Sequence, residues 1–214
     1  MAARPAEHAG RRRASVMSVE VSQESIDSLE EYATVPIAFE VGAVFDVAGR
    51  GDDGGGFVLT ERALDAPYLK DYDAAEGEGP ACWAKRFDLS NWGLFAARVE
   101  GRRVGGAAVA FDTPGLDMLE GRRDLAVLWD IRVSPGARGQ GVGSALFRAA
   151  EAWAGARGCR RLKVETQNVN VPACRFYMRQ GCVLGAVDPS AYPGLPEEVQ
   201  LLWYKEITRP APSG

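Results

Sequence analysis

The feature that most constrains this chain is a glycine-rich loop between two segments of different periodicity. The loop reads Arg138-Gly139-Gln140-Gly141-Val142-Gly143. Before it, residues 125–133 are largely apolar on both alternating faces, which is typical of an interior strand. After it, residues 142–157 repeat apolar side chains at helical spacing, and Gly158 ends the pattern. A buried strand, a glycine turn and a helix in this order predict an α/β fold.

The glycine loop is suited to hold an anion. Glycine permits a positive φ and leaves no Cβ between the backbone and a ligand, and the first N–H groups of the following helix have no partner within it. A pyrophosphate there would gain backbone hydrogen bonds, the positive end of the helix dipole and the charge of Arg138. We therefore expect a cofactor that carries phosphate. The alternative is a tight turn that needs glycine only for packing.

Two other phosphate-binding folds do not match the loop. A dinucleotide-binding turn needs Gly-x-Gly-x-x-Gly, but the sixth position is Ser144 counted from Gly139 and Leu146 counted from Gly141. A P-loop needs Gly-Lys-Ser/Thr, which the sequence lacks. Upstream of residue 125 the chain shows only β-like runs, whereas a doubly wound sheet would have strand-helix repeats on both sides.

The flanking segments predict a mixed sheet with two helices. Alternating or continuous apolar runs predict strands at residues 39–47, 92–99, 104–111, 125–133, 162–166, 182–187 and 199–207, and helices at 142–157 and 172–180. Residues 49–56, with Asp52 and Asp53, are expected to form a loop. Strict alternation along 125–133 would place one set of side chains, Leu125, Val127, Trp129, Ile131 and Val133, on one face, and Ala126, Leu128, Asp130 and Arg132 on the other.

Composition excludes several classes of protein. No run approaches the roughly 18 apolar residues of a membrane span. The single histidine, His8, lies in an Arg/Ala/Gly-rich leader, which argues against a Ser-His-Asp hydrolase, a His-Cys protease or a zinc site, so no metal is expected. The four cysteines form no Cys-x-x-Cys pair, which favours reduced thiols and a cytoplasmic protein.

Charge is unevenly distributed along the chain. Residues 1–18 carry four arginines and one glutamate, a net of +3, so the other residues must total −7 to give the formal net charge of −4. An acidic body argues against nucleic acid and favours a cationic small molecule as partner. We expect residues 1–18 to be a flexible tail, 19–207 a single domain and 208–214 a C-terminal tail. A homodimer is left open.

Two motifs resemble those of the Gcn5-related N-acetyltransferases (GNAT). Arg138, Gly141 and Gly143 fill the Arg/Gln-x-x-Gly-x-Gly/Ala signature, and a second element runs from Asn170 through Ala173 and Phe176-Tyr177 to Gly181. The resemblance covers residues 125–207. It implies a mixed, mostly antiparallel sheet with splayed central parallel strands and flanking helices. It also implies acetyl-CoA as co-substrate, in a cleft between strands 125–133 and 162–166.

The resemblance further implies which residues hold acetyl-CoA. The pantetheine would pair with the backbone near residues 131–133, the diphosphate would lie on the glycine loop, and the second helix would cross the thiol. The residues concerned are Ile131, Arg132, Val133, Arg138, Gly139, Gln140, Gly141, Val142, Gly143, Ser144, Asn170 and Tyr177.

Amide formation from a thioester needs a neutral amine and a proton for the departing thiolate. An alkyl amine has a pKa of about 10, so a base or a water relay must remove a proton at neutral pH. Carboxylates are the natural candidates here: Glu165 ends its strand, and Asp130 lies in an otherwise apolar strand. The alternatives are ion pairs, of Glu165 with Lys163 and of Asp130 with Arg132. The resemblance implies Tyr177 as general acid, and simple packing on its helix is the alternative.

The resemblance extends to the streptothricin acetyltransferases over most of residues 37–207. The matching segments are 39–41, 66–70 with Tyr72, 130–131, 165–167, 173–174, 176–177 and 203–204. This implies direct acetyl transfer, in a ternary complex, to a primary amine of a cationic antibiotic. Alternatives are another acceptor (an aminoglycoside, a polyamine or a protein N-terminus) and a non-catalytic acyl-CoA sensor.

Two positions depart from the streptothricin acetyltransferase pattern. A dense acidic run after residues 67–70 is reduced to four separated acids, and Cys182 replaces the usual aromatic residue after Gly181. Asp71 and Asp73 are interpreted either as contacts to the substrate or as solvated charges of a loop. The four acids of the reduced run are Asp71, Asp73, Glu76 and Glu78.

Overall fold

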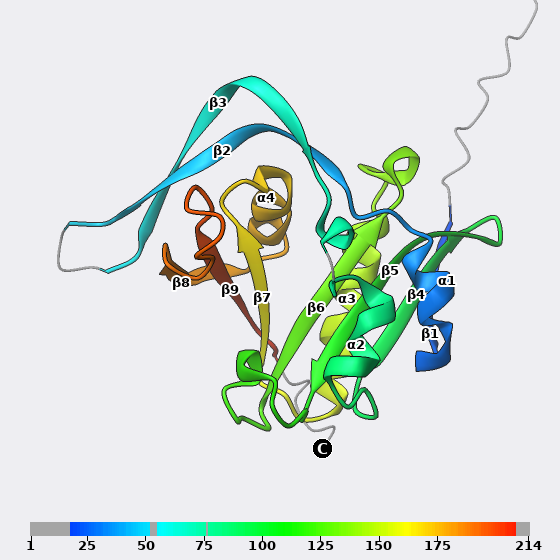
Figure 1. Cartoon of the computed structure of the whole chain (residues 1–214). Coiled ribbons are helices and arrows are strands. Elements are labelled where there is room, and N and C mark those ends of the chain that lie inside the picture. The colour runs from blue at the N-terminus through cyan, green and yellow to red at the C-terminus, as the bar shows by residue number, and fades with distance from the viewer. Residues whose placement is uncertain (1–17, 52–54, 76, 209–214) are drawn as a thin grey trace, which may run out of the picture.

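The computed structural model describes residues 18–51, 55–75 and 77–208 (Figure 1). The strands are β1 (Val19–Glu24), β2 (Phe39–Gly49), β3 (Phe57–Lys70), β4 (Gly93–Val99), β5 (Arg102–Phe111), β6 (Leu125–Val133), β7 (Arg161–Gln167), β8 (Val183–Asp188) and β9 (Gln200–Glu206). The helices are α1 (Leu29–Ala33), α2 (Pro80–Arg86), α3 (Val142–Ala156) and α4 (Val171–Arg179). Short 3-10 turns lie at η1 (Ile26–Ser28), η2 (Tyr72–Ala74), η3 (Asp117–Leu119) and η4 (Pro135–Ala137).

Seven strands form one sheet in the order β1-β4-β5-β6-β7-β9-β8. Every neighbouring pair in this sheet is antiparallel except β6 and β7, which are parallel. The predicted mixed, mostly antiparallel sheet is therefore confirmed. β2 and β3 form a separate antiparallel hairpin that arches over α4 (Figure 1).

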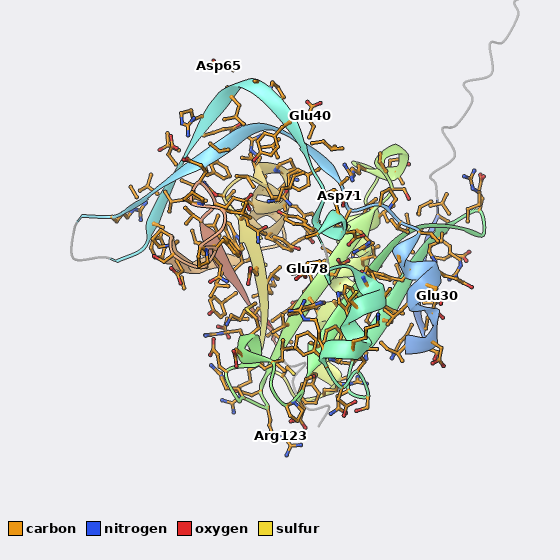
Figure 2. All side chains as sticks on the ribbon, viewed as in Figure 1. Glu30, Glu40, Asp65, Asp71, Glu78 and Arg123 are labelled. Atoms are coloured by element: carbon orange, nitrogen blue, oxygen red, sulfur yellow. The ribbon has the colours of Figure 1, made fainter. Side chains whose placement is uncertain are left out.

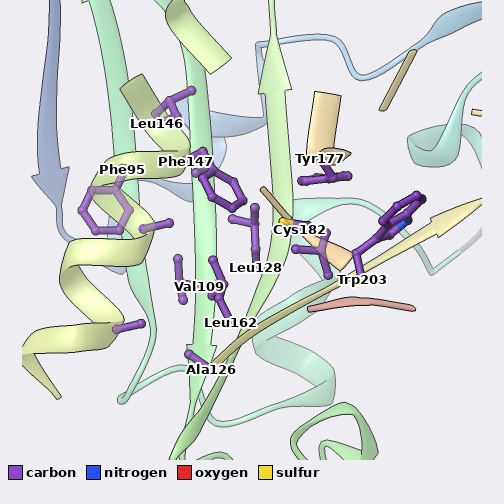
Figure 3. Packing of buried hydrophobic residues seen from close by; sticks show 14 of the residues in the cluster. Phe95, Val109, Ala126, Leu128, Leu146, Phe147, Leu162, Tyr177, Cys182 and Trp203 are labelled. Atoms are coloured by element: carbon purple, nitrogen blue, oxygen red, sulfur yellow. The ribbon is translucent and has the colours of Figure 1, made fainter. Parts of the chain in front are cut away.

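The sheet carries an apolar core on each face. On one face α3 packs its stripe of Val142, Leu146, Phe147 and Ala150 against β4, β5 and β6 (Figure 3). On the other face Tyr32 of α1 and Trp83 of α2 lie in a second cluster with Trp92, Leu94 and Val127. Burying both faces explains why β5 and β6 read as continuous apolar runs.

A β-bulge at Trp129 corrects the predicted faces of β6. Ala108 of β5 pairs with Asp130 and Val109 pairs with Leu128, so Trp129 is the extra residue. After the bulge the alternation is shifted by one residue. Ile131 and Val133 therefore pack on the α3 side, and the strict alternation predicted across residues 125–133 is wrong beyond Trp129.

The parallel pair β6 and β7 separates part-way along its length. The paired positions run from Leu125 with Arg161 to Leu128 with Val164, whereas β6 continues to Val133 and β7 to Gln167. The predicted splay is therefore present. The backbone groups that point from the last residues of β6 toward β7 have no ladder partner there, which leaves them available to a ligand.

Several elements were missed by sequence patterns. α1 and α2 have five and seven residues, too few to show a helical period. β3 contains Pro67, which lies in the irregular stretch between the two paired parts of the hairpin. Three cysteines are buried and Cys82 is half-buried. A membrane-spanning helix is absent from the described part of the chain.

Some expectations concern residues that the structure does not describe. These are the predicted N-terminal tail with His8 (apart from Ser18), the loop residues Asp52 and Asp53, Glu76 of the diluted acidic run, and the C-terminal tail from residue 209 on.

Candidate active site

A cavity of about 990 Å³ opens where β6 and β7 separate. Its wall includes the start of α3, the facing side of α4, the ends of β6 and β7, and the first residues of β2. Among the predicted site residues, the wall contains Asp130, Ile131, Arg132, Val133, Arg138, Gly139, Gly141, Gly143, Ser144, Glu165, Asn170 and Tyr177. Gln140 and Val142 do not line it, and the Val142 side chain is buried in the core.

One end of the cavity has the geometry of an anion site. Gly139 and Gly141 have φ values of 75° and 85°, and a Cβ on either would meet no protein atom within 4 Å. The first hydrogen bond of α3 runs from the Ala145 N–H to the Gly141 carbonyl, so the preceding amides of the helix have no partner within it. Unpartnered amides at a helix N-terminus attract phosphate.

Some of the charged and polar side chains at this end already form hydrogen bonds within the protein. Arg138 donates from Nε to the Val133 carbonyl at 3.0 Å and from Nη2 to the Ala38 carbonyl at 2.9 Å, which fixes the guanidinium beside the loop. Ser144 accepts a hydrogen bond from Gln180 at 3.1 Å, which joins α3 to the end of α4. Arg179 of α4 also lines the cavity, although no sequence motif identified it.

Tyr177 of α4 lines the cavity and packs against Phe147 of α3. Its ring is 5.2 Å from Phe176 and 6.2 Å from Phe147, and it is only 4% exposed (Figure 3). Asn170 caps α4 by accepting from the Ala173 N–H at 3.2 Å, which fixes the helix that carries Tyr177. Burial raises the pKa of Tyr177 well above its ordinary value, so the hydroxyl is protonated at neutral pH.

Glu165 lies on β7 at the point where the strand leaves β6, and it faces the cavity. Its carboxylate accepts from the Tyr192 hydroxyl at 2.5 Å and from Gln200 Nε2 at 2.8 Å. The alternative ion pair with Lys163 is wrong, because Lys163 Nζ contacts Glu120 at 2.8 Å. Glu165 is thus held by neutral donors and keeps an opening to the cavity.

Asp130 belongs to a buried ionic network on the opposite wall. Its side chain is 7% exposed and accepts from Arg132 Nη2 at 2.7 Å, and the Tyr32 hydroxyl also donates to it. Arg132 is 0% exposed and reaches Asp73 at 2.7 Å as well. Burial would lower the pKa of Arg132, but hydrogen bonds and charge from Asp130 and Asp73 outweigh it and raise the pKa. The ion pair foreseen as the alternative for Asp130 is therefore present.

Close packing at Gly106 lets Tyr32 reach this network. A Cβ on Gly106 would lie 2.5 Å from the Tyr32 ring, so only glycine leaves room for that ring across β5. The Arg132 guanidinium stacks over the same ring at 5.1 Å. Burial raises the pKa of Tyr32 well above its ordinary value, so its hydroxyl stays a donor to Asp130.

The remaining cavity wall is acidic and aromatic. Glu40 at the start of β2 and Glu78 before α2 line it, and Figure 2 shows Glu40 on the arch of the hairpin and Glu78 lower down, near α2. Asp73 lines it too but is already paired with Arg132, whereas Asp71 instead accepts from the Asp73 N–H at 3.0 Å. The aromatic part of the wall consists of Phe39, Tyr72, Trp83, Trp129 and Phe176. Such a surface favours a cation.

Comparison with known proteins identifies the family. A sequence model of the Acetyltransferase (GNAT) family matches residues 61–182. The chain belongs to this family. It is therefore an N-acetyltransferase, and GNAT acetyltransferases use acetyl-CoA. Within the described residues no cluster of His, Cys, Asp and Glu could hold a metal ion.

Individual relatives are similar to this chain over nearly its whole length. The streptothricin acetyltransferase of Streptomyces lavendulae is 31% identical over 187 residues, which cover 87% of this chain and 90% of the relative. A crystal structure of nourseothricin acetyltransferase has a TM-score of 0.68 and 27% identity, over 89% of this chain and 99% of that one. A putative streptothricin acetyltransferase from Bacillus anthracis, in complex with acetyl coenzyme A, has a TM-score of 0.71, 23% identity and coverage of 88% and 99%.

Proposed function

We propose that this GNAT enzyme transfers the acetyl group directly, in a ternary complex, to a primary amine of a cationic small molecule, and that the acceptor is streptothricin. The observation that carries the proposal is the cavity where β6 and β7 separate. Its wall includes the glycine loop at the start of α3, Glu165 and Tyr177, and a set of acidic and aromatic side chains. The name of the S. lavendulae relative supports the choice of acceptor.

Acetyl-CoA would supply the acetyl group as a thioester. In this proposal the amides of residues 142–144, with Arg138 and the open turn at Gly139 and Gly141, hold its diphosphate. The free backbone of residues 131–133 pairs with the pantetheine, and Asn170 holds α4 in place beside it. The open space beside both glycines supports this assignment, because a side chain there would fill the approach to the amides.

Glu165 is proposed as the general base. It removes a proton from the acceptor ammonium, directly or through one water, so that the neutral nitrogen can attack the thioester carbon. Neutral donors from Tyr192 and Gln200, with a longer contact of 3.5 Å from Gln167, already fix its position, and its carboxylate has no ion pair with a described residue. Asp130 has three donors on its oxygens, so we assign it to the electrostatic wall that faces the ammonium.

Tyr177 is proposed as the general acid. When the carbon–sulfur bond breaks, its phenol donates a proton to the departing thiolate. The raised pKa of the buried Tyr177 keeps that proton on the oxygen until the thiolate forms. No hydrogen bond joins this hydroxyl to another described residue, so the proton is free to be aimed at the cavity.

A thiol-release assay with acetyl-CoA tests the proposal. Streptothricin is compared with an aminoglycoside, a polyamine and a peptide amine. We expect turnover with streptothricin, and we expect Glu165→Gln and Tyr177→Phe each to lower kcat by about 10²-fold or more with little change in CoA binding. Unchanged turnover in both variants would contradict the assigned roles.

The same panel separates the alternatives. Faster turnover of another amine would support the proposed acetyl transfer but show that this amine, and not streptothricin, is the acceptor. CoA binding without turnover of any amine would instead favour an acyl-CoA sensor. The pairing of Glu165 and Tyr177 in one cavity supports an enzyme, because a sensor needs neither group at the thiol end. A homodimer stays a prediction.

A further inference from the structure

A line of hydrogen-bonded side chains ends on the Glu165 carboxylate. We propose that Tyr192, in the segment between β8 and β9, is a positioning residue that holds Glu165 in its reactive orientation. This inference rests on the proposed role of Glu165 as base. Tyr192 is not part of the cavity wall, so it would act through Glu165 and would not touch either substrate.

The line begins at the cavity and returns to it. The Tyr72 hydroxyl donates to Gln167 Oε1 at 2.5 Å, Gln167 Nε2 donates to the Tyr192 oxygen at 2.8 Å, and the Tyr192 hydroxyl donates to Glu165 Oε1 at 2.5 Å. Gln200 of β9 donates to the second carboxylate oxygen at 2.8 Å. Both oxygens of Glu165 are therefore located by neutral donors.

Each hydrogen bond in this line fixes the direction of the next. Because Gln167 presents its oxygen to Tyr72, its NH₂ group faces Tyr192. A phenol has a single proton, and since the Tyr192 oxygen already accepts from Gln167, that proton points to Glu165. A hydroxyl that is both accepting and donating gives a stronger and better-directed hydrogen bond than an isolated one.

The segment that carries Tyr192 is itself tied to the hairpin. Glu198 forms an ion pair with Lys70 at the end of β3, and both side chains are largely buried. Tyr72 follows two residues later and lines the cavity. The Lys70–Glu198 pair thus joins the end of the β2–β3 hairpin directly to the segment between β8 and β9, and Tyr72 reaches that segment only through Gln167 of β7. The position of Glu165 therefore depends on elements that the family's motifs do not include.

This arrangement predicts a specific loss in Tyr192→Phe. The ring and its packing remain, and only the donor to Glu165 is removed. We expect kcat to fall about tenfold, the low end for loss of a hydrogen bond to a charged group, while the KM for acetyl-CoA changes less than about twofold. Tyr204→Phe on β9 is the matched control, because no hydrogen bond joins the Tyr204 hydroxyl to a described residue, and its kcat should stay near wild type.

A double-mutant cycle with Glu165→Gln decides between positioning and a general structural role. If Tyr192 acts through Glu165, then Tyr192→Phe should lower kcat in the wild-type background and have almost no further effect in Glu165→Gln. The same fold loss in both backgrounds would overturn the inference while leaving Glu165 as base. An unchanged kcat in Glu165→Gln would overturn the proposed base, and this inference with it.

A second variant covers the case in which Tyr192→Phe does not fold. Gln167→Leu keeps Tyr192 but removes the donor that directs its proton, together with a long contact of 3.5 Å from Gln167 Nε2 to Glu165 Oε1. Its kcat should fall about threefold, again with no further loss in Glu165→Gln. Thermal melting of every variant checks that the fold is intact. A threefold loss that persists unchanged in Glu165→Gln would again contradict a role through the carboxylate.

Discussion

The two ends of the cavity are built in different ways. The cofactor end comes from short stretches of chain, chiefly residues 131–144 and the start of α4, and its geometry follows from glycine φ values and free helix amides. The acceptor end combines residues of β2, η2, α2, β6 and β7. Hydrogen bonds and ion pairs between residues 59 to 98 positions apart hold η2 to β6 and β7, and α1 to β6. Sequence motifs therefore identify the residues of the cofactor end, whereas the residues of the acceptor end can be identified only from the tertiary structure.

The largest expected effect concerns the buried ion pairs of the acceptor end. Arg132→Met would leave Asp130 and Asp73 without their shared cation in a buried setting. We expect the free energy of unfolding to fall by about 3–5 kcal/mol, measured by chemical denaturation at neutral pH.

The exposed pair on the hairpin is the control for that loss. Arg62 contacts Asp46 at 3.0 Å, but both side chains are more than half exposed, so Arg62→Ala should leave the free energy of unfolding nearly unchanged. Equal losses in the two variants would show that Arg132 contributes no more than a surface ion pair.

The next effect tests the cofactor end. Gly141→Val forces a β-branched residue to a φ of 85° and fills the open space beside the amides. Strain plus a lost hydrogen bond is worth about 2–3 kcal/mol, so CoA should bind roughly 30- to 150-fold more weakly in calorimetry.

Gly136→Ala provides the matched comparison within the same loop. Gly136 does not line the cavity, lacks a positive φ and has open space around its Cα. Its variant should bind CoA as the parent does. If both variants bound CoA equally well, the turn would serve packing alone.

A smaller effect is expected from the acidic wall. Glu40→Gln removes a charge from the cavity, so the KM for a dicationic acceptor should rise about three- to tenfold while the KM for acetyl-CoA stays the same. Added salt should shrink the difference. Asp65→Asn, on the outer part of the arch and away from the cavity, should leave both KM values unchanged (Figure 2).

The smallest expected effect is a difference in thiol reactivity between buried and half-buried cysteines. Burial raises the pKa of Cys174 to about 11 and that of Cys182 to about 12, so at pH 8 both thiols are almost fully protonated and unreactive. The half-buried Cys82 should therefore be alkylated first in the native protein, as mass spectrometry can show. Equal labelling of Cys82 and Cys182 at pH 8 would indicate that the region beneath α4 opens readily.

Sequence patterns predicted the elements whose signal is local. The expected strand at 125–133 and helix at 142–157 differ from β6 and α3 by at most one residue. The expected splay of β6 and β7 was implied by the resemblance to the family and is present. These features depend on periodicity and on glycine, both of which can be read within about fifteen residues.

Other features leave no local signal. Because β6 is apolar on both faces, its alternation does not reveal the bulge at Trp129 that turns Asp130 and Arg132 toward Tyr32. Arg179 and Tyr192 belong to no motif, and Tyr192 lies in a segment rich in proline and glycine. The hydrogen-bond partners of Tyr192 lie more than twenty residues away in sequence, so only the folded chain brings them together.

A crystal structure with bound CoA tests the central claim most directly. The account predicts the diphosphate against the amides of residues 142–144 and the sulfur within about 3.5 Å of the Tyr177 hydroxyl, on the side of the cavity that faces Glu165. Density for CoA elsewhere on the protein, or a sulfur directed away from both side chains, would contradict it.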